Sequence, residues 1–147
     1  MTEQAERQGW MGLLARAPAA ELKRLWQAAG GAEGFAWLRP PEVGTVMVRG
    51  RTGGTGAPFN LGEMTVTRCA LRLESGAVGH AMVQGRDREK AEIAARVDAG
   101  MQGAGAAGLR AALLAPLAQA EAQRARLRAA KADATRVDFF TMVRGED

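Results

Sequence analysis

The stretch from Val46 to Leu73, VMVRGRTGGTGAPFNLGEMTVTRCALRL, organises the prediction for the whole chain. Its two ends are rich in β-branched and apolar residues, which favours strands over residues 46–51 and 64–73. The connection at 52–58 is dense in glycine and contains a proline, so it cannot form the interior of a helix. We expect it to turn the chain or to hold a ligand against its backbone.

Side-chain alternation indicates how these strands are buried. Val46 and Val48 point to one side of the first strand while Met47 and Arg49 point to the other, because successive side chains of a strand face opposite ways. The second strand breaks this alternation at Arg68. A β-bulge or burial on both faces is therefore expected there.

The remaining elements predict an α+β fold. An N-terminal pair of helices precedes a mainly antiparallel sheet of four strands, and helices with a docked apolar tail complete the chain. The helix pair is expected at 3–16 and 18–29, the strands at 35–39, 43–51, 64–73 and 77–84, and the later helices after Asp87 and from 117 to 134. Pro40-Pro41 is expected to stop the first strand at a sheet edge.

Length and composition indicate one modest domain spanning residues 1–147. The formal net charge is +4, but acidic residues are interspersed with the basic ones, so no basic stripe marks a nucleic-acid surface. The single cysteine, Cys69, favours a reducing compartment. No segment reads as a signal peptide or a membrane span, and we expect a cytoplasmic protein.

Reactive side chains do not form a recognisable catalytic pattern. Cys69 and His80 fall on adjacent predicted strands, yet each is better explained as a structural residue. The glycine-rich turn is a weak candidate for contact with an anion, through the backbone of Gly53, Gly54 and Gly56. Arg86, next to a predicted helix start, is the companion candidate, although the neighbouring Asp87 would repel an anion.

The C-terminal part of the chain favours contact with a partner. Residues 117–134 have strong helix propensity but almost no apolar stripe, so most of that helix needs solvent or another protein around it. The tail at 136–147 is rich in apolar residues and is expected to dock on the chain's own sheet or on a partner. Its expected anchors are Phe139, Phe140, Met142 and Val143.

Several long phrases resemble one family. They are GGTGAPFNLGEMTVTRCALRL at 53–73, GHAMVQGRDREKAEIAARVDA at 79–99 and RVDFFTMVRG at 136–145, with RQGWMGLLARAPAAEL at 7–22 in support. Together they resemble the G subunit of the bacterial carbon–phosphorus lyase core complex, over nearly the whole chain.

This resemblance implies a small subunit that assembles in paired copies with H, I and J subunits. The complex transfers ribose triphosphate from ATP to an alkylphosphonate, and adenine leaves. ATP is then a substrate of the complex, while the iron–sulfur cluster and S-adenosylmethionine belong to a partner. The resemblance assigns no catalytic residue, cofactor or metal to this chain.

We therefore expect an accessory subunit of a phosphonate-activating enzyme. The alternative from a different class is a stand-alone phosphate- or nucleotide-binding enzyme that uses Arg49, Arg51, Arg68 and Arg86 around the glycine-rich turn. A nucleic-acid binder is a third and weaker alternative, which salt-sensitive binding to a duplex would support.

Overall fold

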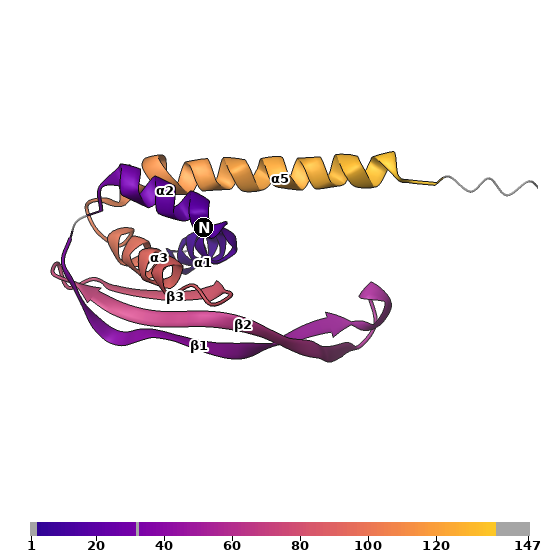
Figure 1. Cartoon of the computed structure of the whole chain (residues 1–147), viewed down its shortest axis with the longest axis horizontal. Coiled ribbons are helices and arrows are strands. Elements are labelled where there is room, and N and C mark those ends of the chain that lie inside the picture. Colours follow the sequence, from indigo (N-terminus) through magenta and orange to yellow (C-terminus); the bar gives the residue numbers. More distant parts are fainter. Residues whose placement is uncertain (1–2, 32, 138–147) are drawn as a thin grey trace, which may run out of the picture.

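The structure is a computed structural model that describes residues 3–31 and 33–137. Its main elements are α1 (Glu3–Arg16), α2 (Ala19–Ala29), β1 (Phe35–Arg51), β2 (Pro58–Leu73), β3 (Val78–Gln84), α3 (Arg88–Gly100), α4 (Ala106–Leu109) and α5 (Ala115–Ala134). Figure 1 shows one curved sheet with the helices gathered on a single side of it. The chain is therefore α+β, as the sequence predicts.

The N-terminal helix pair is confirmed. α1 buries Trp10 and Leu14, and α2 buries Leu22 and Leu25, which lie at the helical spacing that the sequence indicates. α2 ends at Gly30, whose backbone is left-handed with φ of 65°. Glycine adopts that conformation without steric cost, which explains why the helix stops there.

The prediction of four strands is wrong. In the described residues the sheet has three strands, in the order β1-β2-β3, and both pairings are antiparallel. Residues 35–39 and 43–51 belong to the single strand β1, which continues through Pro40-Pro41. β1 pairs on one side only, and an edge strand tolerates prolines because fewer of its backbone N–H groups are needed for pairing.

The irregularity expected at Arg68 is a bulge on the neighbouring strand. Arg39 lies opposite Ala70 and Glu42 lies opposite Arg68, so β1 advances three residues while β2 advances two. The extra length absorbs the proline pair and increases the local twist. Arg68 is exposed and its Nε donates to Glu42 Oε1 at 2.9 Å.

The core lies between the sheet and the helices, and α3 is at its centre. Ile93, Ala94, Val97 and Met101, which recur at helical spacing in the sequence, are buried together with alanines of the same helix. α3 approaches β3 very closely at Gly79, where a Cβ atom would overlap the carbonyl oxygen of Ala95. A glycine is thus required at that position to let the helix backbone reach the strand.

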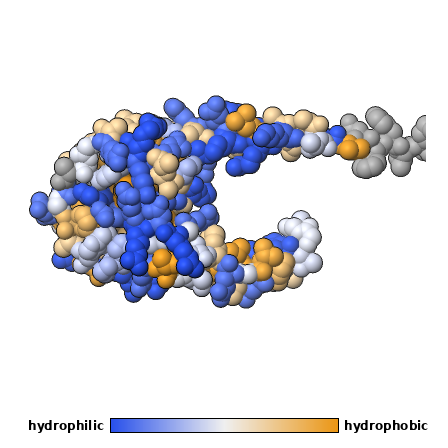
Figure 2. All heavy atoms as spheres, in the orientation of Figure 1, coloured by the Kyte–Doolittle hydropathy of each residue, from blue (hydrophilic) through white to orange (hydrophobic). Residues whose placement is uncertain are grey.

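The C-terminal helices follow one another without a break. α4 leads into a π-helical turn, η2 (Arg110–Leu114), and Pro116 then lies in the first turn of α5. Pro116 lacks the N–H that the preceding turn would use, and the chain passes there from the π-helical turn into α5 without leaving helical backbone angles. Figure 2 shows two projections, α5 and the far end of the β1–β2 hairpin, extending the same way across an open space.

Candidate functional site

The first projection is the part of the β1–β2 hairpin that lies beyond β3, here called the hairpin arm and comprising residues 46–64. β3 reaches only as far as Gln84, which pairs with Val66. Within the arm the strands pair regularly from Val46 opposite Met64 to Arg51 opposite Pro58, with one register shift. The arm therefore has a fixed register but no third strand.

One face of the hairpin arm is apolar. Val46 lies opposite Met64, and Val48 lies two residues along the same strand, so these side chains share a face. A Cβ atom on Gly50, also on that face, would lie 3.5 Å from the Phe59 ring and 3.9 Å from Leu61 Cβ. Phe59 and Leu61 are 44% and 66% exposed, which is unusual for side chains of that size.

The glycine-rich turn forms the tip of the hairpin arm and is held by its own hydrogen bonds. Gly53 and Gly54 have positive φ angles of 60° and 83°. The N–H of Gly56 donates to the carbonyl of Thr52 at 2.7 Å, and Arg51 Nη1 donates to the Gly56 carbonyl at 3.2 Å. Gly56 thus uses both backbone groups inside the turn.

Arg86 does not join the glycine-rich turn. It follows Gly85, whose N–H donates to the Thr65 carbonyl at 2.9 Å, so Arg86 lies at the base of the hairpin arm. Seven residues of β2 (58–64) separate that base from the turn at the tip, which corresponds to about 23 Å of strand. The structure therefore does not bring together the two groups that were predicted as anion contacts, and contact of either with an anion stays a prediction.

The second projection is α5 beyond its last contact with the helices. Two ion pairs fix its first half: Arg16 Nε to Glu121 Oε1 at 2.7 Å, and Arg124 Nη1 to Glu21 Oε2 at 3.0 Å. Every residue from 125 to 137 is exposed. This agrees with the nearly stripe-free sequence of that helix. We call residues 125–134 the helix arm.

The predicted tail anchors lie outside the described residues. Phe139, Phe140, Met142 and Val143 follow Val137, the last residue that the structure describes. Their role in contact with a partner stays a prediction.

A buried carboxylate that the sequence analysis did not select connects three elements. Asp98 of α3 is fully buried. It accepts hydrogen bonds from Arg7 Nη2 at 2.7 Å, from Trp10 Nε1 at 2.8 Å and from the backbone N–H of His80 at 2.9 Å. The hydrogen bond and charge of Asp98 raise the pKa of Arg7, despite partial burial of the guanidinium. All these partners are structural, so the cluster attaches α1 and β3 to α3.

The start of α3 contains a second polar cluster. Asp87 caps the helix, since its side chain accepts a hydrogen bond from the N–H of Lys90 at 2.9 Å. Burial tends to raise the pKa of Asp87, but that N–H and the Lys23 ammonium outweigh it, so the pKa is lowered. Lys90 is buried and its Nζ donates to the Ala15 carbonyl at 2.9 Å. Burial lowers the pKa of Lys90, against the opposing effect of Asp87.

Cys69 and His80 face opposite sides of the sheet. Cys69 lies opposite Ala81 and is buried against α3, where its thiol donates to the Ala91 carbonyl at 3.2 Å. His80 lies opposite Ala70, and its side chain is exposed. Burial, and secondarily the charge of Glu92, raises the pKa of the thiol to about 11. The interpretation of Cys69 as a small buried hydrophobic residue is confirmed.

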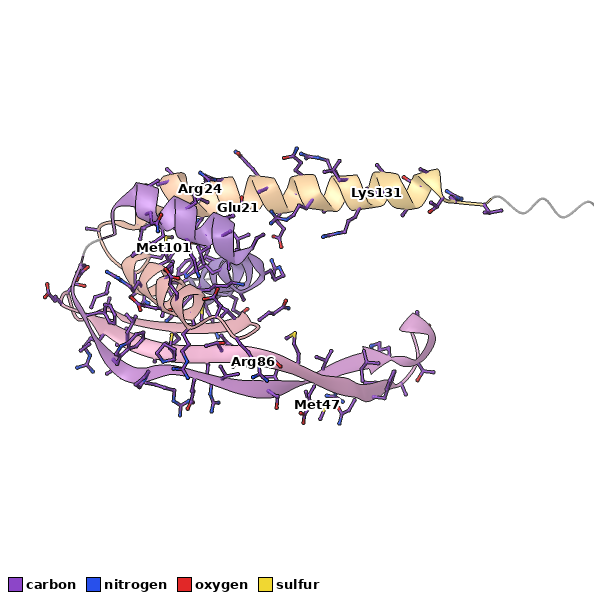
Figure 3. All side chains as sticks on the ribbon, in the orientation of Figure 1. Glu21, Arg24, Met47, Arg86, Met101 and Lys131 are labelled. Carbon is purple, nitrogen blue, oxygen red and sulfur yellow. The ribbon has the colours of Figure 1, made fainter. Side chains whose placement is uncertain are left out.

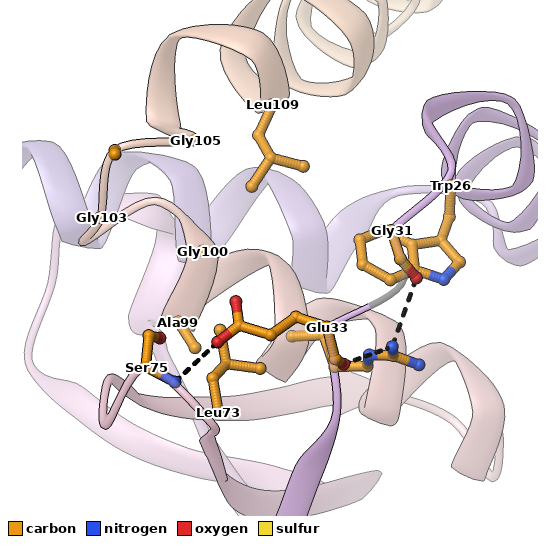
Figure 4. Close-up of a pocket in the computed structure, with 12 residues that line it drawn as sticks. Trp26, Gly31, Glu33, Leu73, Ser75, Ala99, Gly100, Gly103, Gly105 and Leu109 are labelled. Carbon is orange, nitrogen blue, oxygen red and sulfur yellow. Dashed lines mark hydrogen bonds between the residues drawn. The ribbon is translucent and has the colours of Figure 1, made fainter.

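An apolar pocket of about 360 Å³ lies between the start of β1 and the loop after α3 (Figure 4). Trp26, Leu73 and Leu109 line it. Arg96 borders it, but its guanidinium lies 5.1 Å from the Trp26 ring centre and 4.9 Å from that of Phe35, and it donates to backbone carbonyls. Its charge is used to hold the chain together, so the pocket is an apolar recess.

No three His, Cys, Asp or Glu side chains within residues 3–31 and 33–137 lie close enough together to hold a metal ion. Of the helices in the described part, none has the length and apolar character needed to cross a bilayer.

These features define a class of protein. Its buried polar side chains serve the packing of a small α+β body. Several large apolar side chains, Met47, Phe59 and Leu61, are exposed on an arm that the body does not cover, as in subunits of larger assemblies.

The chain belongs to the PhnG family: the family model described as "Phosphonate metabolism protein PhnG" matches residues 5–145. A relative from Rhizobium meliloti (strain 1021), named alpha-D-ribose 1-methylphosphonate 5-triphosphate synthase subunit PhnG, is 48% identical over 143 residues. The match covers 97% of this chain and 92% of that relative. The family resemblance seen in the sequence is thereby confirmed.

Proposed function

We propose that this chain is an accessory subunit of a phosphonate-activating synthase. The complex transfers ribose triphosphate from ATP to an alkylphosphonate, so that the bond between ribose and adenine breaks and adenine leaves. The observation that carries this proposal is the 48% identity to a relative named as a subunit of such a synthase. Because the match covers nearly all of both chains, it concerns the whole subunit and not one shared motif.

In this proposal the catalytic groups belong to partner subunits. Three side chains in the body with potential for chemistry, Asp98, Lys90 and Cys69, are buried and bonded to other parts of the same chain. Such pairing supports a structural role for them. ATP then binds as a substrate of the complex, and the iron–sulfur cluster and S-adenosylmethionine belong to a partner.

The proposed partners are the H, I and J subunits of the carbon–phosphorus lyase core complex, in a cytoplasmic assembly with paired copies. The exposed hairpin arm and helix arm support a subunit that other chains complete. The tail supplies further anchors at Phe139, Phe140, Met142 and Val143, where large apolar side chains in a short segment favour burial at an interface.

Reconstitution tests the proposed function. The H, I and J subunits are purified with and without this chain and incubated with ATP and methylphosphonate, and released adenine is measured by chromatography. We expect adenine release only when this chain is present, and none from this chain alone. Equal activity without it would contradict the proposal, as would adenine release by the isolated chain.

Deleting residues 136–147 tests the tail. The truncated chain should remain folded by circular dichroism but should no longer copurify with the H, I and J subunits. Substituting Arg144 and Glu146 by alanine serves as a matched control, because it leaves the apolar anchors in place. Unchanged copurification of the truncated chain would remove the tail from the interface.

A further inference from the structure

The hairpin arm is a ribbon of two strands without a third. A two-stranded hairpin by itself is at best marginally stable in water. Along residues 58–64, β2 has β1 on one side, while β3 has already ended at Gln84 on the other. That edge of β2 presents backbone groups available to another protein. The pairing of the two strands in the arm is therefore fixed, but the outer edge of β2 has no neighbouring strand in the described part of the chain.

The apolar face of the hairpin arm is turned toward α5. Figure 3 places Met47 on the side of the arm that faces away from α5. Val46 and Val48, on either side of Met47 in the strand, therefore face the opposite way, toward the open space. Met64 lies opposite Val46 and shares its face. The apolar side of the arm borders the space that Figure 2 shows between the projections.

The helix arm presents a different chemistry to the same space. Leu117, Glu121 and Arg124 mark the side of α5 that contacts the body. Steps of three or four residues from Arg124 carry that side on to Leu127, Arg128 and Lys131. Leu127 is 58% exposed. Among the described residues neither Arg128 nor Lys131 forms a salt bridge within 4.0 Å, although the charge of Arg128 helps to lower the pKa of Glu121. The inner side of the helix arm therefore presents a leucine flanked by two exposed positive charges.

We propose that the hairpin arm and the inner side of the helix arm form a clamp for a segment of a partner subunit. The segment carries an apolar face for Val48, Phe59 and Leu61, and acidic side chains for Arg128 and Lys131. This occupant follows from the apolar face of the hairpin arm and from charge complementarity with the basic side chains of the helix arm. This inference rests on the proposed function, since it requires that the chain works inside a hetero-oligomer.

The first test changes the hairpin arm. The double variant Phe59→Ser, Leu61→Ser is co-expressed with the proposed H, I and J subunits, and binding of the purified chains is measured by light scattering or interferometry. We expect affinity to fall about tenfold or more, because large apolar side chains at the centre of an interface carry much of its binding energy. Met82→Ser is the matched control, since Met82 is 48% exposed on β3 outside the arm.

The second test reverses charge on the helix arm. Arg128→Glu with Lys131→Glu should weaken assembly and increase its dependence on salt. Arg126→Glu should not, because residue 126 is two positions from Arg124 and lies on another side of the helix. Equal loss in both variants would overturn the clamp and point to a general effect of net charge.

Hydrogen exchange separates the clamp from its rivals. Amide protons of residues 59–64 should exchange rapidly in the lone chain and slowly in the assembled complex. If the wild-type chain assembles without added protection of these amides, the clamp is overturned while the proposed function stands. The same holds if the Phe59/Leu61 variant assembles as tightly as the wild-type chain. Protection in the lone chain that disappears on removal of residues 136–147 also overturns it, because the chain's own tail would then occupy the arm. Failure of the wild-type chain to join the complex at all would overturn both.

Discussion

The body and the two arms of this molecule differ in how far their side chains are buried. Asp98, at the centre of the body, is fully buried and receives hydrogen bonds from α1 and β3. Leu61, on the hairpin arm, is a large apolar side chain that is 66% exposed. The body pairs its buried polar groups within the chain and buries most of its large apolar side chains, whereas the arms leave Phe59, Leu61 and Leu127 to solvent or a partner. Stability and assembly should therefore respond to changes in different parts of one small protein.

The largest effect on stability is expected at Asp98. Asp98→Ala removes the acceptor for Arg7, the Trp10 indole and the His80 backbone, so it leaves several donors without a partner. Loss of one member of a buried ion pair costs about 3–5 kcal/mol. Urea unfolding followed by circular dichroism measures this loss. Glu63→Ala, a matched carboxylate on the exposed arm, should change the free energy of unfolding by about 0.5 kcal/mol or less. Similar values for the two variants would show that the body is not organised around Asp98.

A glycine pair gives the next contrast. Gly79→Ala places a methyl group against the carbonyl oxygen of Ala95, and a backbone atom cannot rotate out of the way. The expected cost is about 3 kcal/mol, at the upper end for overpacked sites. Gly62→Ala on the hairpin arm meets no atom within 4 Å, so it should be nearly neutral. Thermal unfolding of both variants checks the difference, and a stable Gly79→Ala protein would contradict the close approach of α3 to β3.

The raised pKa of the buried Cys69 thiol predicts that the protein loses stability at alkaline pH. Its pKa is about 11 in the folded protein and 9.0 without burial. Below pH 9 the thiol is protonated in both states, and its contribution is constant. Between pH 9 and 11 the unfolded state loses the proton while the folded state keeps it, so stability falls as pH rises, by about 3 kcal/mol in total.

Urea unfolding at several pH values measures this contribution. The variant Cys69→Ala serves as the reference, since it lacks the thiol and retains the other titrating groups, among them Lys90. Parallel curves for the two proteins would mean that burial does not hold the thiol protonated.

Much of the body follows from the sequence because local signals agree there. Trp10, Leu22 and Ile93 recur with other apolar residues at helical spacing and are buried, and Asp87 caps α3 from its position just before the helix. The predicted number of strands is wrong because Pro40-Pro41 was expected to end the first strand. The edge position of β1 and a bulge allow the strand to continue, and both are tertiary features that a sequence window does not contain.

The surfaces of the candidate site were less predictable. The sequence indicated an unpartnered helix after Leu117, because an apolar stripe is missing there. The sequence predicts the glycine-rich turn and Arg86 as contacts for an anion, yet the structure separates the two by the length of the hairpin arm. Asp98 was missed, although one acidic residue within the apolar stripe of α3 was a usable signal. Its partners come from α1 and β3, which only the folded chain brings together.

Among the leucines of β2, the smallest effect on the lone chain is expected at Leu61, and Leu71 on the same strand is its counterpart in the body. Leu71 and Leu61 both lie on β2, but Leu71 is fully buried in the body and Leu61 is exposed on the hairpin arm. Leu71→Ala should cost about 2–5 kcal/mol through lost burial and a residual cavity. Leu61→Ala should cost about 0.5 kcal/mol or less, because its side chain is already largely in water. Urea unfolding of the two variants under identical conditions gives the comparison. An equal cost at both positions would mean that another part of the same chain covers the arm, and the division between a self-sufficient body and partner-dependent arms would not hold.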